Sequence, residues 1–154
     1  MKLSIKGWAH ALCGLVLAAL LPVAAHGAGS GIPVIAAGHY NQFATSDCGG
    51  LRGCETTFNT VPSGKTLIVT NVSCTIRASG TSVLTGFVLA DAADKASSEL
   101  MPFLVTTLSG GNRFIQSNDT TSHVFKAGQV PTVATTYSAD TSSSLWCSIG
   151  GQLK

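Results

Sequence analysis

The sequence predicts an all-β fold, a two-sheet sandwich of jelly-roll type with eight or nine strands and two disulfide bonds. Three observations lead to this prediction. Short runs of β-type residues alternate with turn residues along most of the 154-residue chain. No helical period lasts longer than a turn or two. Four of the five cysteines, an even number, lie downstream of the N-terminal apolar segment. Many short strands separated by turns are typical of sandwiches, and paired cysteines staple such folds in exported proteins.

The N-terminal residues, 1–27, are predicted to be a secretory signal peptide. Lys2 and Lys6 precede an apolar run over residues 11–21, which Pro22 ends. This run is too short to cross a bilayer, and no second apolar segment follows it. The sequence therefore predicts that the protein is exported, to the periplasm or out of the cell, without stable membrane insertion of the mature protein.

Two cleavage sites fit equally well, after Ala25 and after Gly27, and residues 28–154 are expected to form a single domain. Two of the nine Lys and Arg residues lie in the leader, so seven remain against seven Asp and Glu. Nucleic acids and anionic membranes are bound mainly through an excess of Lys and Arg. A neutral mature surface therefore argues against both kinds of partner.

Turn residues separate nine candidate strands in the mature chain. Pro62–Lys65, Ser109–Asn112 and Ala127–Gly128 are turns by composition. Residues 90–100 depart from the strand pattern, and here the sequence predicts a short helix or an exposed loop. The predicted strands are Ile32–Ala37, Glu55–Val61, Thr66–Ala78, Ser82–Ala90, Met101–Leu108, Arg113–Ser117, Ser122–Lys126, Pro131–Tyr137 and Ser143–Leu153.

Periodicity predicts how the four downstream cysteines pair. Cys74 and Cys147 each lie on the apolar phase of a predicted strand, so both are expected to point into the core. We therefore pair Cys74 with Cys147, across the core or between neighbouring strands, and Cys48 with Cys54 through the flexible Gly-rich segment between them. The cysteine spacing does not fit a zinc site, and no metal or other cofactor is predicted. The two apolar phases are Ile68, Val72, Cys74 and Ile76, and Leu145, Cys147, Ile149 and Leu153.

No motif in the sequence has the spacing that a specific reaction requires. There is no Gly-x-Ser-x-Gly segment, no His-x-His pair and no His-Glu-x-x-His pair. His39 and His123 have no partner motif that would mark them as catalytic. The sequence therefore predicts a protein without catalytic activity. The alternative is a secreted hydrolase that carries no recognisable motif.

Trp146 is the best indication of a binding function. It lies on the opposite phase of the terminal strand from Leu145 and Cys147, so its indole is expected to face away from the core. An outward tryptophan on a β-sheet can stack on a sugar ring, which makes carbohydrate the first ligand class to test. Three further residues are candidates to complete a ligand-binding patch: Tyr137, Tyr40 and Arg113.

Two alternatives stay open at this stage. Trp146 can instead pack beneath a loop or beneath the bridge between Cys48 and Cys54. The domain, which is apolar and weakly charged, can also self-associate as a surface-structural or fimbria-like subunit. In that case residues 26–41, where Ile32 and Val34 alternate with other residues, are the candidate for an arm that lends a strand to a neighbour.

Two segments of the chain carry a resemblance to known proteins. Residues 61–73 hold a Val-Pro-Ser-Gly-Lys turn that leads into a long strand, and residues 147–153 read Cys-Ser-Ile-Gly-Gly-Gln-Leu. In these segments the chain resembles a group of small exported bacterial β-sandwich proteins, which share a Val-Pro-x-Gly-Lys turn and a closing Ser-Ile-x-Gly-x-Leu strand. The resemblance implies an exported β-sandwich and brings no site residue with it.

Overall fold

The computed structural model describes residues 29–93, 97–100, 104–107 and 110–154, so the predicted signal peptide lies outside the described residues. These residues form nine β-strands and no helix, which confirms the all-β prediction. Within this part of the chain, no helix is long and apolar enough to span a membrane. The strands are β1 (Gly29–Ser30), β2 (Val34–Ala36), β3 (His39–Thr57), β4 (Thr66–Ser79), β5 (Leu84–Asp91), β6 (Ser97–Glu99), β7 (Leu104–Thr107), β8 (Asn112–Lys126) and β9 (Pro131–Leu153).

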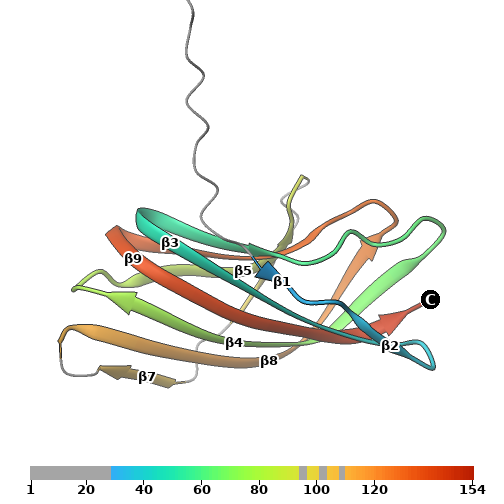
Figure 1. Ribbon diagram of the computed structural model, residues 1–154, viewed down its shortest axis with the longest axis horizontal. Helices are drawn as coiled ribbons and strands as arrows, with labels where there is room; N and C mark the ends of the chain where they lie inside the picture. Colours follow the sequence, from blue (N-terminus) through green and yellow to red (C-terminus); the bar gives the residue numbers. More distant parts are fainter. Residues whose placement is uncertain (1–28, 94–96, 101–103, 108–109) are drawn as a thin grey trace, which may run out of the picture.

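All of the described strands join one antiparallel sheet, which Figure 1 shows along its length. The main order is β1-β3-β9-β4-β8-β7, with β2 also paired to β3 and with β5 joining β9 to β6. The prediction of two separate sheets is not confirmed, because β3 and β9 are long enough to serve both halves of the fold.

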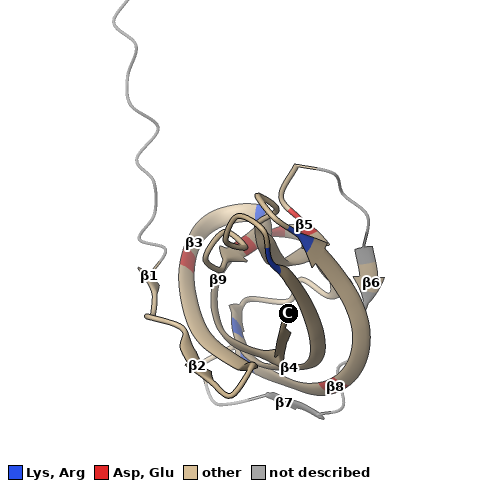
Figure 2. Cartoon of the chain, turned by 90° about the vertical axis from the view of Figure 1, so that its right-hand side faces the viewer, with Lys and Arg blue, Asp and Glu red and all other residues tan. Residues whose placement is uncertain are grey.

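The two halves divide at a bend in the long strands. In the first half, residues 39–48 of β3 pair with residues 143–152 of β9, and β4 and β8 follow. In the second half, residues 53–57 of β3 pair with residues 132–136 of β9, and β5 and β6 follow. Figure 1 shows these halves as two layers, and Figure 2 shows the strands curving around a common interior.

The predicted bridge between Cys48 and Cys54 is confirmed, and it spans the bend in β3. The register of β3 against β9 shifts between Cys48 and Gly53, and Gly50 has a φ of 64°. Such a left-handed backbone favours glycine, because a Cβ atom would crowd the chain there. The disulfide joins the two residues on either side of this bend. It therefore fixes the point at which β3 passes from one layer to the other.

The predicted bridge between Cys74 and Cys147 is also confirmed, and it joins neighbouring strands. The two residues lie opposite each other on β4 and β9, with their Cα atoms 4.2 Å apart. Both are buried in the core. Because Cys48, Cys54, Cys74 and Cys147 are all disulfide-bonded, none of them is a metal ligand in this structure. Two disulfides fit an oxidising, exported location.

The inward faces of both halves form one hydrophobic cluster. Along β9 the predicted alternation holds, since Leu145 and Cys147 are fully buried while Trp146 between them is partly exposed. The phase predicted for Ile68 is wrong. Leu67, which precedes it, is buried, and Ile68 is partly exposed, because the register of β4 shifts between Val69 and Asn71 and reverses the alternation there. Further core residues are Phe58, Val61, Val69, Val72, Ile76, Phe87, Leu89, Ile115, Phe125, Val133 and Ile149.

Several predicted strand boundaries are wrong because bends and bulges inside long strands resemble turns in the sequence. The strand β8 joins two predicted strands into one, and so does β9. The prediction of a short helix or an exposed loop over residues 90–100 is wrong for much of the described part, because β5 extends to Asp91 and Ser97–Glu99 form β6. Residues 94–96 lie outside the described part.

The N-terminal arm proposed for strand exchange is not free in this structure. Gly29 and Ser30 pair with Thr45 and Ala44 of β3, and β2 forms a hairpin with the start of β3. The buried side-chain amide of Gln42 also donates to the Gly31 carbonyl oxygen at 2.8 Å. The described arm therefore covers the edge of β3 in its own chain.

Candidate functional site

Trp146 lies at the centre of the outer face of the first half, on the side opposite the core. Its cross-strand neighbours are Thr45 on β3 and Thr75 on β4. Both threonines are partly exposed, as is Trp146 itself. Side chains directly opposite one another on a sheet contact each other, so the two threonines flank the indole and hold it in place. The indole is thus partly exposed on the outer side of the curved sheet.

Four further side chains surround Trp146 at the diagonal positions of the ladder. Phe43 and Asp47 lie on β3, one on either side of Thr45, and Ser73 and Arg77 lie on β4, one on either side of Thr75. Diagonal neighbours on a sheet are about 7–8 Å apart, which is within reach of aromatic and long side chains. Phe43 is 50% exposed, and this makes it a second aromatic surface next to Trp146.

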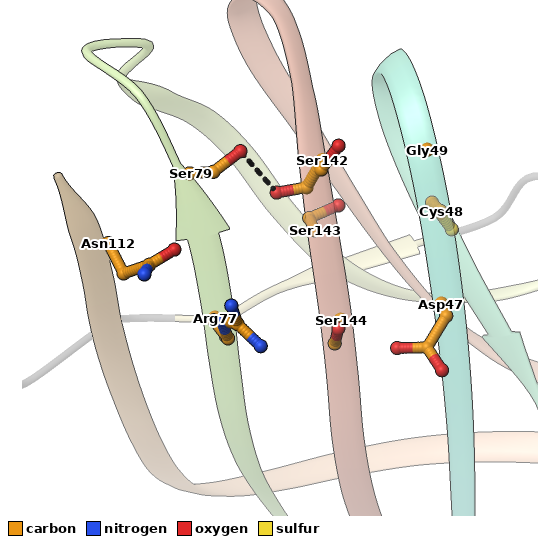
Figure 3. A pocket seen from close by; sticks show the side chains of 9 residues that line it. All are labelled: Asp47, Cys48, Gly49, Arg77, Ser79, Asn112, Ser142, Ser143 and Ser144. Carbon is orange, nitrogen blue, oxygen red and sulfur yellow. Dashed lines mark hydrogen bonds between the residues drawn. The ribbon is translucent and has the colours of Figure 1, made fainter. Parts of the chain in front are cut away.

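A shallow depression of about 280 Å³ opens near Trp146, and its lining includes Ser144, the preceding outward residue of β9. Asp47 and Arg77 lie on opposite sides of Ser144 at its floor, and in Figure 3 both side chains point toward Ser144. Above them, the Ser79 hydroxyl donates to the Ser142 carbonyl oxygen at 3.1 Å, which fixes that wall. The lining residues are Asp47, Cys48, Gly49, Arg77, Ser79, Asn112, Ser142, Ser143 and Ser144.

Asp47 and Arg77 carry opposite charges that do not meet. Neighbouring strands are about 4.8 Å apart, so residues on β3 and β4 that flank β9 are separated by about 10 Å between Cα atoms. Among the described residues, the ion pair is Arg52–Asp140 at 3.4 Å, and Asp47 and Arg77 form none. Both side chains are exposed. Their hydrogen-bonding atoms therefore remain open to a ligand or to water.

Most other outward positions of this face carry neutral groups that form hydrogen bonds, and an exception is the partly exposed Phe114 of β8, which lies opposite Arg77. Outward positions on the four central strands carry Ser, Thr, Asn and Gln side chains, and Figure 2 shows the described charges scattered rather than gathered in a patch of one sign. Aromatic surfaces beside neutral donors and acceptors can hold a polar ring by stacking and by hydrogen bonds. The neutral outward residues are Asn41, Thr45, Asn71, Ser73, Thr75, Gln116, Asn118, Ser144 and Ser148.

The structure does not bring the four predicted ligand-binding residues together. Of these, Trp146 lies on the outer face, whereas Tyr40 and Tyr137 are buried at 5% and 4% exposure. The Tyr40 hydroxyl donates to the Gln42 side-chain oxygen, and burial raises the pKa of Tyr40 to about 12. Arg113 donates to the carbonyl oxygens of the loop between β4 and β5, at 2.8 and 3.1 Å. Tyr40, Tyr137 and Arg113 therefore belong to the framework rather than to the face around Trp146.

His123, which the sequence leaves without a partner, contacts Ser98. The Ser98 hydroxyl lies 2.7 Å from Nδ1 of His123, and the imidazole packs against the Phe125 ring at 4.6 Å between centroids. Burial lowers the pKa of His123, and the nearby Asp91 carboxylate opposes this shift. Asp91 in turn accepts hydrogen bonds from Gln129 and from the backbone of Val130. The contact braces β6 against β8. The hydrolase alternative stays a prediction.

Sequence reasoning missed Phe43, Asp47 and Arg77 as parts of the face. For Phe43 and Asp47 the reason is that β3 was not predicted before residue 55, because two of its inward positions, Gln42 and Ser46, are polar and hide the alternation. Arg77 lies on a predicted strand, but its place near Trp146 depends on the pairing of β4 with β9. The signal that could have found the face is the other phase of the same segments, where Phe43 alternates with exposed polar residues.

Comparisons of the chain with protein-family models, with curated proteins and with solved structures found no match.

Proposed function

We propose that this protein is an exported, non-catalytic module that binds carbohydrate on the outer face of its sheet, with Trp146 as the stacking platform. The observation that carries this proposal is the position of Trp146. It lies partly exposed at the centre of the outer face of the sheet, whose other side chains are mostly neutral hydrogen-bonding groups. A sugar ring presents an apolar face to an aromatic ring and hydroxyl groups at its edge, and this face supplies a partner for each.

The geometry favours an extended ligand over a small enclosed one. Phe43 adds a second exposed aromatic ring on β3, and the depression of about 280 Å³ lies on the other side of Trp146, at Ser144. Pockets for drug-sized molecules measure about 300–1,000 Å³, so the depression suits a single ring at the end of a longer chain. This succession along β9 therefore fits an oligosaccharide that lies along the strand.

The compartment supports the same proposal. A signal peptide over residues 1–27 would deliver the mature chain to the periplasm or the cell exterior, where its two disulfides are stable and cell-wall polysaccharides are found. Such a module would need no cofactor, because stacking and hydrogen bonds alone hold the ligand.

The test uses residues 28–154, in which Trp146 is the one tryptophan, since the other, Trp8, lies in the predicted leader. Titration of the mature protein with cell-wall and plant-type oligosaccharides is expected to change Trp146 fluorescence saturably for one sugar class. Calorimetry then compares Trp146→Ala with Val83→Ala, whose side chain is also exposed but lies outside this face. Loss of the platform should weaken binding about tenfold or more, which corresponds to about 1.4 kcal/mol.

Three results would speak against carbohydrate binding on the face around Trp146. Fluorescence that is indifferent to every oligosaccharide would remove the argument from Trp146. Equal affinity for the wild type and Trp146→Ala would place the ligand elsewhere. Equal losses for Trp146→Ala and Val83→Ala would point to general destabilisation instead of a lost platform.

Self-association is a second candidate, favoured by the exposed apolar residues of the N-terminal arm. Ile32 is 92% exposed, Val34 67% and Ile35 50%, all within the arm that covers the edge of β3. Burial of such side chains stabilises by about 25 cal/mol per Å², so a second copy would gain from covering them. Light scattering across a hundredfold dilution tests this. A concentration-dependent mass that Ile32→Ser abolishes supports it, and a constant monomer mass contradicts it.

A further inference from the structure

The depression beside Trp146 holds two opposite charges that face each other across a gap. Asp47 and Arg77 both point toward Ser144, which lies between them on β9 (Figure 3). In the described part of the chain neither of them forms an ion pair. The strand β9 lies between their strands, so the two side chains stand on either side of Ser144.

The chemistry of the two side chains restricts what can fill the gap. A carboxylate only accepts hydrogen bonds, and a guanidinium only donates them. A group that bridges them must therefore donate on one side and accept on the other, and a hydroxyl group does both. Two neighbouring hydroxyl groups on a sugar ring meet this requirement without a charge of their own.

A charged sugar fits the same gap less well. The carboxylate of a uronic acid would form a bidentate pair with Arg77, but it would also lie near the carboxylate of Asp47. The two side chains contribute no net charge to the depression, so it offers no excess of positive charge to attract an anion.

We infer that the Asp47–Arg77 gap selects a neutral sugar, and that it takes the hydroxyl edge of the ring next to the one that stacks on Trp146. This inference rests on the proposed carbohydrate-binding function and adds the class of sugar. Trp146 provides a stacking surface for any pyranose, whereas Asp47 and Arg77 form hydrogen bonds with the hydroxyl groups at the edge of the adjoining ring. Ser144 matters because its small side chain leaves the gap open.

The experiment compares neutral hexasaccharides with hexamers of galacturonic and glucuronic acid, by calorimetry on the mature protein. The wild type should bind a neutral hexamer with an affinity that changes little between 20 and 500 mM salt, because screening acts on charged ligands. Asp47→Asn and Arg77→Gln should each weaken neutral binding about tenfold, as expected for a lost hydrogen bond to a charged group. Ser144→Leu, which fills the gap, should do the same.

A matched control removes the same charges elsewhere. Arg52 and Asp140 form an exposed ion pair, with side chains 73% and 69% exposed, so Arg52→Gln with Asp140→Asn should leave affinity and salt dependence unchanged. In Asp47→Asn the remaining Arg77 should admit the acidic hexamers, with an affinity that falls as salt rises.

The outcomes separate this inference from the proposed function. If Trp146→Ala loses binding but Asp47→Asn and Arg77→Gln match the control, the platform stands and the selection of a neutral sugar is overturned. A wild type that prefers the acidic hexamers overturns it as well. If the wild type binds no oligosaccharide, both the function and the inference fail.

Discussion

The two disulfides should contribute unequally to stability, and their positions in the chain predict by how much. Cys74 and Cys147 are 73 residues apart, whereas Cys48 and Cys54 are 6 apart. A cross-link removes more conformational entropy from the unfolded chain when it closes a longer loop. The chain-entropy relation gives about 4.4 kcal/mol for the long bridge and about 2.2 kcal/mol for the short one.

The perturbation is a pair of double substitutions, Cys74→Ala with Cys147→Ala and Cys48→Ala with Cys54→Ala. The two loops do not overlap along the chain, so their entropy contributions should add. For a domain of this size, a loss of 1 kcal/mol lowers Tm by about 4 °C. We expect Tm to fall by about 18 °C without the long bridge and by about 9 °C without the short one, as measured by calorimetry and urea unfolding.

A control separates the bridge from the sulfur atoms that pack in the core. The reduced wild type lacks both bridges but keeps all four sulfurs, so its stability compared with the four-alanine variant reports the packing contribution alone. If removing the short bridge lowers stability as much as removing the long one, or more, the argument from loop length is refuted. It would show instead that the bend in β3, which Cys48 and Cys54 hold, limits the stability of the fold.

Four further predictions follow from single residues. Because the pKa of His123 is lowered in the folded state, the unfolded chain binds more protons. Stability should therefore fall as pH drops from about 6.5 toward that lower pKa. In urea titrations at several pH values, His123→Gln should lack this loss. Tyr40 has a raised pKa, so stability should be lost as pH rises from about 10 to about 12, and the 295 nm absorbance step near pH 12 should disappear in Tyr40→Phe. Gln42→Ala should lower the free energy of unfolding by about 2 kcal/mol or more, since it leaves the Tyr40 hydroxyl and the backbone N–H of Asn59 without their acceptor. Tyr40→Phe should lower it by less in the same denaturation assay. Ser46→Ala should raise stability by up to about 1 kcal/mol, because the buried Ser46 hydroxyl has no partner among the described residues, and an unchanged or lower midpoint would contradict this.

The sequence predicts the strands with strong apolar alternation well. The strand β4 was predicted over Thr66–Ala78 and extends by one residue further, and the buried phase of β9 around Cys147 is as expected. The bridge between Cys74 and Cys147 follows from the same alternation, because both point inward from core strands, whereas the bridge between Cys48 and Cys54 was predicted from the flexible Gly-rich segment between them. The first part of β3, before residue 55, was not predicted. There the inward positions include Gln42, which is buried for its hydrogen bonds and not for its hydrophobicity.

The candidate site was predictable only in part. The outward direction of Trp146 follows from period-2 alternation alone. Its neighbours do not, because the register between strands far apart in the chain decides them. Phe43 and Arg77 reach Trp146 only because β3 and β4 both pair with β9, at registers that no local pattern encodes.

The sequence by itself determined the all-β class, both disulfide pairings and the direction of Trp146, because each depends on local alternation or on a small number of combinations. The tertiary structure decided that one continuous sheet bends back on itself, that Tyr40, Tyr137 and Arg113 serve the framework, and that Asp47 and Arg77 face each other across Ser144. These features depend on which strands lie side by side. That choice is made by packing the whole core at once, and a shift of one residue in register would have turned each of these side chains to the other face.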